Sequence, residues 1–108
     1  MAIPVTFFLR TDDGGRLWVD GLPVVDQWRD QGVPGLNGPQ GVINLIPGQR
    51  YAIVVEMYEK GGQEACILDW AYQAQTEVLV PTGNLFTAVP PPRLSVASGT
   101  LRISEARA

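Results

Sequence analysis

The stretch Arg10-Thr-Asp-Asp-Gly-Gly-Arg-Leu-Trp-Val-Asp-Gly21 sets the predicted fold of this chain. It places two adjacent carboxylates, Asp12 and Asp13, on a loop between an alternating strand and a tight hairpin. Asp20-Gly21 predicts the hairpin turn, because both central positions of a type I′ turn need a positive φ, which Asp and Gly tolerate best. That turn fixes the register of the two strands beside the acidic loop.

The paired carboxylates of the acidic loop have two interpretations. Adjacent carboxylates repel each other unless a positive charge lies between them, and a hard cation such as calcium takes oxygen ligands of this kind. Alternatively, Asp12 caps the turn through its side chain while Asp13 lies in solvent beside Arg10 or Arg16, since aspartate is a common turn residue. The residues alone leave both interpretations open.

Alternation of apolar and polar residues predicts strands on both sides of this stretch. We expect the strand at 51–58 to be the longest and to lie centrally in its sheet, because its middle is almost continuously apolar. Pro23 places the second hairpin strand at an edge. The expected strands span 3–9, 16–19, 22–25, 42–46, 51–58, 65–71 and 76–80, followed by Leu85-Phe86.

A long surface loop is predicted from Arg29 to Gln40, where Gly, Pro and Asn are too frequent for a regular element. Loops of this length often bind ligands. Trp28, at the entrance of the loop, is the tryptophan that we expect to be exposed, whereas Trp18 and Trp70 are expected in the core. Asp69 is expected to be the cross-strand partner of an arginine.

The C-terminal segment reads as a separate unit after Pro90-Pro91-Pro92. Apolar residues alternate on either side of Ala97-Ser-Gly99, which predicts a small hairpin from Leu94 to Ile103. Two strands cannot bury an apolar face alone. We therefore divide the chain into a main domain, residues 1–88, and a Pro-rich connection with a hairpin, residues 89–108, packed on the main domain or on a second chain.

Composition places the chain among folded, turn-rich, all-β domains, with 108 residues, 45% hydrophobic content, 12 Gly and 9 Pro. The net charge of −3 and the absence of a Lys/Arg run exclude nucleic acid as a partner. There is no His, and Cys66 is expected to be a buried, inert thiol, so catalysis is poorly supported. No segment is apolar for long enough to span a membrane, and none reads as a signal peptide.

The run Phe7-Phe-Leu-Arg-Thr-Asp-Asp-Gly-Gly-Arg-Leu-Trp-Val-Asp-Gly-Leu-Pro-Val-Val-Asp-Gln-Trp28 closely resembles the protective-antigen-fourteen (PA-fourteen) domain. Later segments follow in the family's order. They are Val42-Ile-Asn-Leu-Ile-Pro-Gly-Gln-Arg-Tyr51, Ile53-Val-Val-Glu-Met-Tyr-Glu-Lys-Gly-Gly62, Leu68-Asp-Trp70 and Val80-Pro-Thr-Gly-Asn-Leu-Phe86. Together these motifs cover roughly residues 5 to 87.

The resemblance implies a two-sheet antiparallel β-sandwich, barrel-like in outline, of a kind found in glycosidases, toxins and adhesins, which usually binds carbohydrate outside the cell. In the calcium-dependent lectin branch, two aspartates joined by a cis peptide bond bind calcium, and the calcium binds sugar hydroxyls. These aspartates correspond to Asp12 and Asp13. The other ligands come from a second loop, here Gly62, Gln63 and Glu64, and the candidate sugar contacts are Trp28, Asp30 and Asn37.

The chain departs from the family in lacking the N-terminal strands that normally complete the sandwich. We expect the C-terminal hairpin to fill the vacated edge; otherwise a second copy must cover it, as a homodimer, because open edges promote pairing. The leading interpretation is a non-catalytic, lectin-like module that binds glycan through calcium. The alternative is a structural or protein-interaction domain, as a monomer or a homodimer, without a metal or sugar site.

Overall fold

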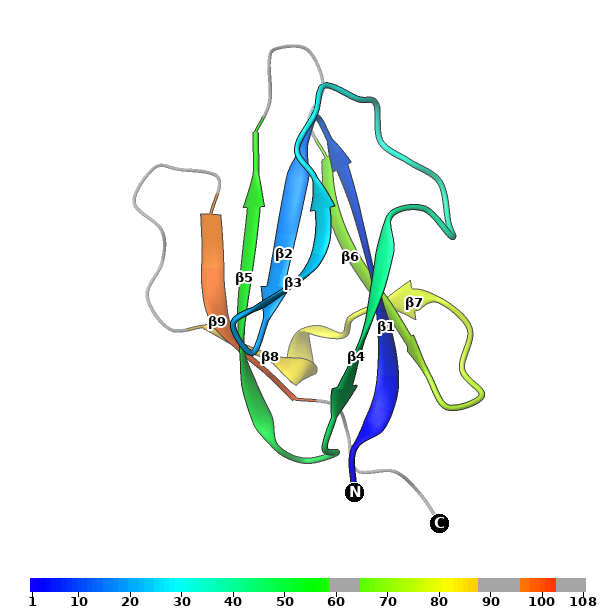
Figure 1. Ribbon diagram of the computed structural model, residues 1–108, viewed down its shortest axis with the longest axis vertical. Helices are drawn as coiled ribbons and strands as arrows, with labels where there is room; N and C mark the ends of the chain where they lie inside the picture. The colour runs from blue at the N-terminus through cyan, green and yellow to red at the C-terminus, as the bar shows by residue number, and fades with distance from the viewer. Residues whose placement is uncertain (59–64, 88–95, 103–108) are drawn as a thin grey trace.

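The computed structural model describes residues 1–58, 65–87 and 96–102 as two antiparallel sheets packed face to face (Figure 1). One sheet has the strand order β4-β1-β6-β7 and the other β3-β2-β5-β9-β8. The prediction of an all-β antiparallel sandwich is therefore confirmed. The elements are β1 (Ile3–Asp12), β2 (Gly15–Val19), β3 (Leu22–Gln27), β4 (Gln40–Leu45), β5 (Arg50–Met57), β6 (Ala65–Tyr72), β7 (Val78–Leu79), the 3-10 turn η1 (Thr82–Asn84), β8 (Leu85–Thr87) and β9 (Val96–Arg102).

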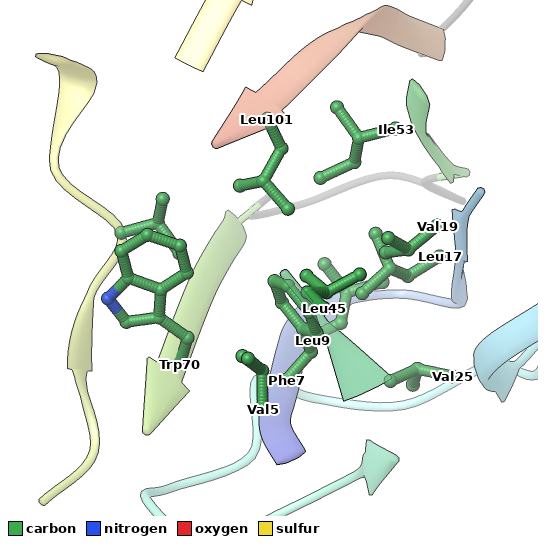
Figure 2. Close-up of a cluster of buried hydrophobic side chains, with 11 residues drawn as sticks. Val5, Phe7, Leu9, Leu17, Val19, Val25, Leu45, Ile53, Trp70 and Leu101 are labelled. Atoms are coloured by element: carbon green, nitrogen blue, oxygen red, sulfur yellow. The ribbon is translucent and has the colours of Figure 1, made fainter. Parts of the chain in front are cut away.

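Strand β1 supplies one wall of the core, as its alternating sequence predicts. Val5, Phe7 and Leu9 are buried between the sheets and pack against residues from both of them (Figure 2). The other members of the core cluster share this burial, and they are Leu17, Val19, Val25, Leu45, Ile53, Trp70, Val80 and Leu101. The core thus joins strands from the whole length of the chain.

The hairpin between β2 and β3 has the predicted turn. Asp20 and Gly21 have φ values of 53° and 76°, the positive values that a type I′ turn requires. The Asp20 amide also donates a 2.8 Å hydrogen bond to the carbonyl of Ala52, which ties the turn to β5. Strand β3, with Pro23, is an edge strand, as predicted.

Three smaller expectations need correction. Strand β5 lies centrally in its sheet, as predicted, but its 8 residues are fewer than the 10 of β1. Trp18 is only half-buried and is outside the core cluster, because its register partner is Val54, on the outer face of β5. Cys66, the second residue of β6, is exposed rather than buried.

The predicted C-terminal hairpin is wrong in the part that the structure describes. Residues 96–102 form one continuous strand, β9, through the expected turn at 97–99. It pairs with β5 on one side and with β8 on the other, so Gly99 lies opposite Ile53. Leu94 and Ile103 lie outside the described residues. A single strand packed on the same sandwich takes the place of the hairpin, and the division of the chain near residue 88 stays a prediction.

The long loop predicted at 29–40 is present as residues 28–39, since Gln40 begins β4, and it is joined to the sheet that contains β1. The amide of Leu9 donates to the carbonyl of Pro39 over 3.1 Å. On the outer face of the same sheet, Arg10 Nε lies 3.0 Å from Oδ2 of Asp69, whose side chain is 1% exposed, which confirms the predicted cross-strand pair. Polar contacts thus hold this loop and this sheet face together.

Candidate functional site

The acidic loop connects the end of β1 to the start of β2 at one end of the sandwich (Figure 1). The peptide bond between Asp12 and Asp13 is cis, the geometry implied by the resemblance. Both aspartates are half-buried, whereas Gly14 is buried. A Cβ at Gly14 would overlap the ring of Tyr58 and lie 2.6 Å from the amide nitrogen of Arg29, so the loop has room only for glycine there.

The two described residues that flank positions 59–64 both pair with the acidic loop. Tyr58 precedes the segment, and its carbonyl accepts a 2.9 Å hydrogen bond from the amide of Asp13 while its own amide donates to the carbonyl of Gly14 over 3.0 Å. Ala65 follows the segment and is the register partner of Asp12. The described residues on either side of the predicted second ligand loop are therefore both paired with the acidic loop.

The long loop folds back onto the acidic loop through Gln31. Its amide donates a 3.2 Å hydrogen bond to Oδ1 of Asp13, and its side-chain Nε2 donates to the carbonyl of Thr11 over 3.1 Å. Arg29 Nε in turn donates to Oε1 of Gln31 over 3.2 Å. Part of the Asp13 carboxylate is thus engaged by the long loop, whereas the turn interpretation expected Asp13 to lie in solvent beside Arg10 or Arg16.

The side chains of Asp30 and Tyr58 form a short hydrogen bond at this end of the molecule. The Tyr58 hydroxyl donates to Oδ1 of Asp30 over 2.7 Å. This hydrogen bond, then burial, and then the negative charges of Asp30 and Asp13 raise the pKa of Tyr58 to about 12. The phenol is therefore a fixed donor throughout the physiological pH range, and it holds the base of the long loop against the end of β5.

Arg16, Trp28, Asp30 and Tyr58, which we term the apex cluster, present an aromatic and cationic surface. The rings of Trp28 and Tyr58 lie with centroids 4.9 Å apart at an angle of 56°. The Arg16 guanidinium carbon lies 3.8 Å above the Trp28 ring, and Nε of the same arginine is 3.4 Å from Oε1 of Glu56. Trp28 nevertheless leaves 43% of its surface exposed, as expected from the sequence. An exposed indole is thus held from two sides.

A family comparison matches residues 5–84 with the PA14 domain. The chain belongs to the PA14 domain family. Anti-sigma-I factor RsgI3 of Acetivibrio thermocellus is 33% identical over 81 residues, which are 75% of this chain and 12% of that protein. A solved structure of an anti-sigma factor domain-containing protein has a TM-score of 0.73 and 31% identity, over 85% of this chain and 32% of that one. This PA14 domain therefore spans only a small part of each relative.

Apart from the aspartate pair, the predicted site residues of the PA14 domain fall into three groups. Trp28 and Asp30 lie in the apex cluster, close to Asp13. Asn37 lies elsewhere, and its backbone amide donates a hydrogen bond to Oε1 of Glu77 over 2.7 Å. Gly62, Gln63 and Glu64 lie outside the described residues. The structure thus brings two of the three candidate sugar contacts together and separates the third from them.

Arg16, Gln31 and Tyr58 were not predicted as site residues. Tyr58 is the last residue of the strand predicted at 51–58, just before the segment that carries the predicted second ligand loop, a position that could have identified it. Nothing in the spacing of Arg16 or Gln31 indicates that they meet Trp28 and Asp13. Their roles depend on contacts between segments that are far apart in the chain.

The described residues do not complete a calcium shell by themselves. Within residues 1–58, 65–87 and 96–102, no three His, Cys, Asp or Glu side chains are grouped as metal ligands. Asp12 and Asp13 would supply only part of the six to eight oxygens that calcium takes, and Asp13 already accepts a hydrogen bond from Gln31. A calcium site at this loop stays a prediction that needs further oxygens.

Across the described ranges, no helix combines the length and apolar character needed to cross a membrane.

Proposed function

We propose that this PA14 domain is a non-catalytic protein-interaction domain, and that the apex cluster is its contact surface. The observation that supports this function is the exposed Trp28 held between Arg16 and Tyr58. Trp, Tyr and Arg are the residue types that most often dominate the binding energy of protein interfaces. A side chain already fixed in its bound geometry loses less conformational entropy on association.

The relatives support a protein as the partner class. Both are described as anti-sigma factor proteins, and an anti-sigma factor, by its name, acts on a sigma factor, which is a protein. Because the matched region is only 12% and 32% of those chains, their whole activity does not transfer to this domain. We propose that the domain serves a larger regulatory protein of this type as one of its recognition parts.

The test is a binding measurement with the sigma factor of the organism that encodes the chain, immobilised for interferometry. Truncating a central interface tryptophan typically costs 2 kcal/mol or more, so Trp28→Ala should weaken binding by about thirtyfold. Leu22→Ala is the matched control, because Leu22 is 55% exposed on the hairpin turn, at the opposite end of the sandwich. Absence of binding, or an equal loss in both variants, contradicts the proposal.

A second candidate function, calcium-dependent glycan binding, is supported by a different observation. The two residues that flank the predicted second ligand loop, Tyr58 and Ala65, are both paired with the acidic loop. In this function Asp12 and Asp13 would hold calcium with oxygens from Gly62, Gln63 and Glu64. Trp28 and Asp30 would contact the sugar, since aromatic faces suit the apolar side of a pyranose.

A panel of soluble glycans, measured by tryptophan fluorescence with calcium and again with chelator, tests this second function. The calcium-dependent function predicts saturable glycan binding that occurs with calcium and not with chelator. Asp12→Asn or Asp13→Asn should abolish this binding. Asp20→Asn is the matched control, because Asp20 carries the same charge on the distant hairpin turn and its amide replacement also tolerates a positive φ. Glycan binding that persists in chelator excludes the calcium mechanism.

A further inference from the structure

Two arginines lie directly opposite each other at the end of the sandwich away from the apex cluster. Arg50 begins β5 and Arg102 ends β9, and the antiparallel register pairs one with the other. Both are exposed. Like charges in directly opposed positions destabilise a strand pair, and arginine keeps its charge at every physiological pH. This pair therefore lowers stability unless another group compensates for it.

An aromatic ring orients both guanidinium groups. The Cζ atoms of Arg50 and Arg102 lie 3.7 Å and 5.2 Å from the centroid of the Phe86 ring, which belongs to the neighbouring strand β8. The side-chain Nδ2 of Asn84 donates a 2.7 Å hydrogen bond to the carbonyl of Arg102 and so fixes the end of β9. Cation–π contacts hold the planar groups in place, but a phenyl ring has no net negative charge.

No described carboxylate neutralises this pair. The ion pairs found among the described residues join Arg10 to Asp69 and Arg16 to Glu56. The chain has 11 acidic residues and a net charge of −3, so carboxylates are plentiful in its sequence. Two oriented guanidinium groups are thus left facing solvent on the outer face of the sheet, with their N–H donors available.

We propose that Arg50, Arg102 and Phe86 form a binding site for an oxyanion, the carboxylate or phosphate group of a ligand. Each guanidinium presents five N–H donors in a planar fork that matches two oxygens of such a group. A bound oxyanion removes the repulsion between the arginines. Tyr58, directly after β5, lies eight positions after Arg50, about 26 Å at ~3.3 Å per residue, so the site is independent of the apex cluster and of the proposed function.

The test is an NMR titration of the whole chain that follows the arginine Nε–Hε resonances. The probes are inorganic phosphate and acetate, added separately, with sodium chloride at the same ionic strength as reference. The proposal predicts saturable shifts of the Arg50 and Arg102 resonances with at least one oxyanion and none with chloride. The two probes distinguish a phosphate ligand from a carboxylate ligand.

Variants show whether the shifts come from this site. Removing one charged hydrogen-bonding partner typically costs about 1.5–3 kcal/mol, so Arg50→Gln should weaken oxyanion binding by at least about tenfold. Arg102→Lys keeps the charge but loses the planar guanidinium group, so it should weaken oxyanion binding several-fold. Arg29→Gln makes the same charge change at the other end and should leave binding unaltered. Linear shifts shared with chloride, or equal losses in Arg50→Gln and Arg29→Gln, overturn the proposal.

Discussion

Gly14 lacks a side chain at the point where the acidic loop, the long loop and the end of β5 meet. A methyl group there would overlap the Tyr58 ring and lie 2.6 Å from the Arg29 amide nitrogen. Since both neighbours are themselves hydrogen-bonded, the backbone would have to move to accept the methyl group. The geometry of the apex cluster thus depends on a residue that takes no part in binding.

Gly14→Ala should lower the free energy of unfolding by about 1–3 kcal/mol, the usual cost of overpacking a close contact. Urea denaturation measures the change. Gly32→Ala, in the same region, is the matched control, because no atom lies within 4 Å of its added Cβ and its stability should be unchanged or slightly raised. Equal behaviour of the two variants would contradict the close packing around Gly14.

The hydrogen bond from Tyr58 to Asp30 gives a second prediction at the residue scale. The pKa of Tyr58, raised to about 12 from 10.0, should fall toward 10.0 in Asp30→Asn, because the amide has no charge to oppose the phenolate. Ultraviolet difference spectroscopy follows the titration, and Tyr58→Phe identifies the signal. Because the folded pKa is the higher one, this contribution to stability is complete below pH 10.0 and is lost as the pH rises through about 12. An unaltered titration in Asp30→Asn would be evidence against the contact.

Strand β9 lies between β5 and β8 and thus connects β8 to the rest of its sheet. Its Leu101 is fully buried in the common core, beside Ile53 (Figure 2). Leu101→Ala should therefore cost about 2–5 kcal/mol of unfolding free energy, as for other buried leucines.

The matched control for this strand is Leu79→Ala, because Leu79 is 64% exposed and its truncation should change stability by only about 0.5 kcal/mol. Chemical denaturation of the isolated chain measures the change in unfolding free energy for both variants. A small effect of Leu101→Ala would mean that the C-terminal strand is not part of this core, as in a separately packed unit.

Glu77, which accepts a hydrogen bond from the backbone amide of Asn37 in the long loop, gives a pH dependence at the scale of elements. Burial and a hydrogen bond with Asp69 raise the pKa of Glu77 from 4.5, against the smaller opposing effects of the Asn37 amide and the Arg10 charge. A raised folded pKa contributes stability that is complete below pH 4.5 and is lost as the pH rises through the folded value.

Glu77→Gln removes this ionisation, while its side-chain oxygen can still accept the Asn37 amide. The variant should lose the fall in stability that begins above pH 4.5 and should be the more stable form at neutral pH. Denaturation midpoints measured across this pH range test the effect. An identical pH profile for both proteins would show that Glu77 ionises freely in the folded state.

The sequence predicted most elements, because strand alternation and turn residues are local properties. The exception is β9, where Ala97-Ser-Gly99 has the composition of a turn. Pairing with β5 and β8 gives these residues an extended conformation instead. Such pairing depends on strands distant in the chain, which local composition does not encode.

The apex cluster could be predicted only in part for the same reason. Trp28 and Asp30 were identifiable from their place at the long loop, and the aspartate pair from its repulsive chemistry. Arg16 and Tyr58 reach Trp28 from β2 and from the end of β5, and no spacing in the sequence brings these positions together.

At the scale of the whole molecule, the central claim is that this PA14 domain recognises a protein through the apex cluster and needs no metal to do so. A thermal melt of the purified chain in millimolar calcium, and again in chelator, tests that claim most directly. We predict equal midpoints. A ligand at a hundredfold excess over its dissociation constant stabilises the native state by ~2.7 kcal/mol, or about 10–20 °C for a domain of this size. A rise of that order in calcium, lost in Asp13→Asn and retained in Asp20→Asn, would contradict our account and favour the calcium-dependent function.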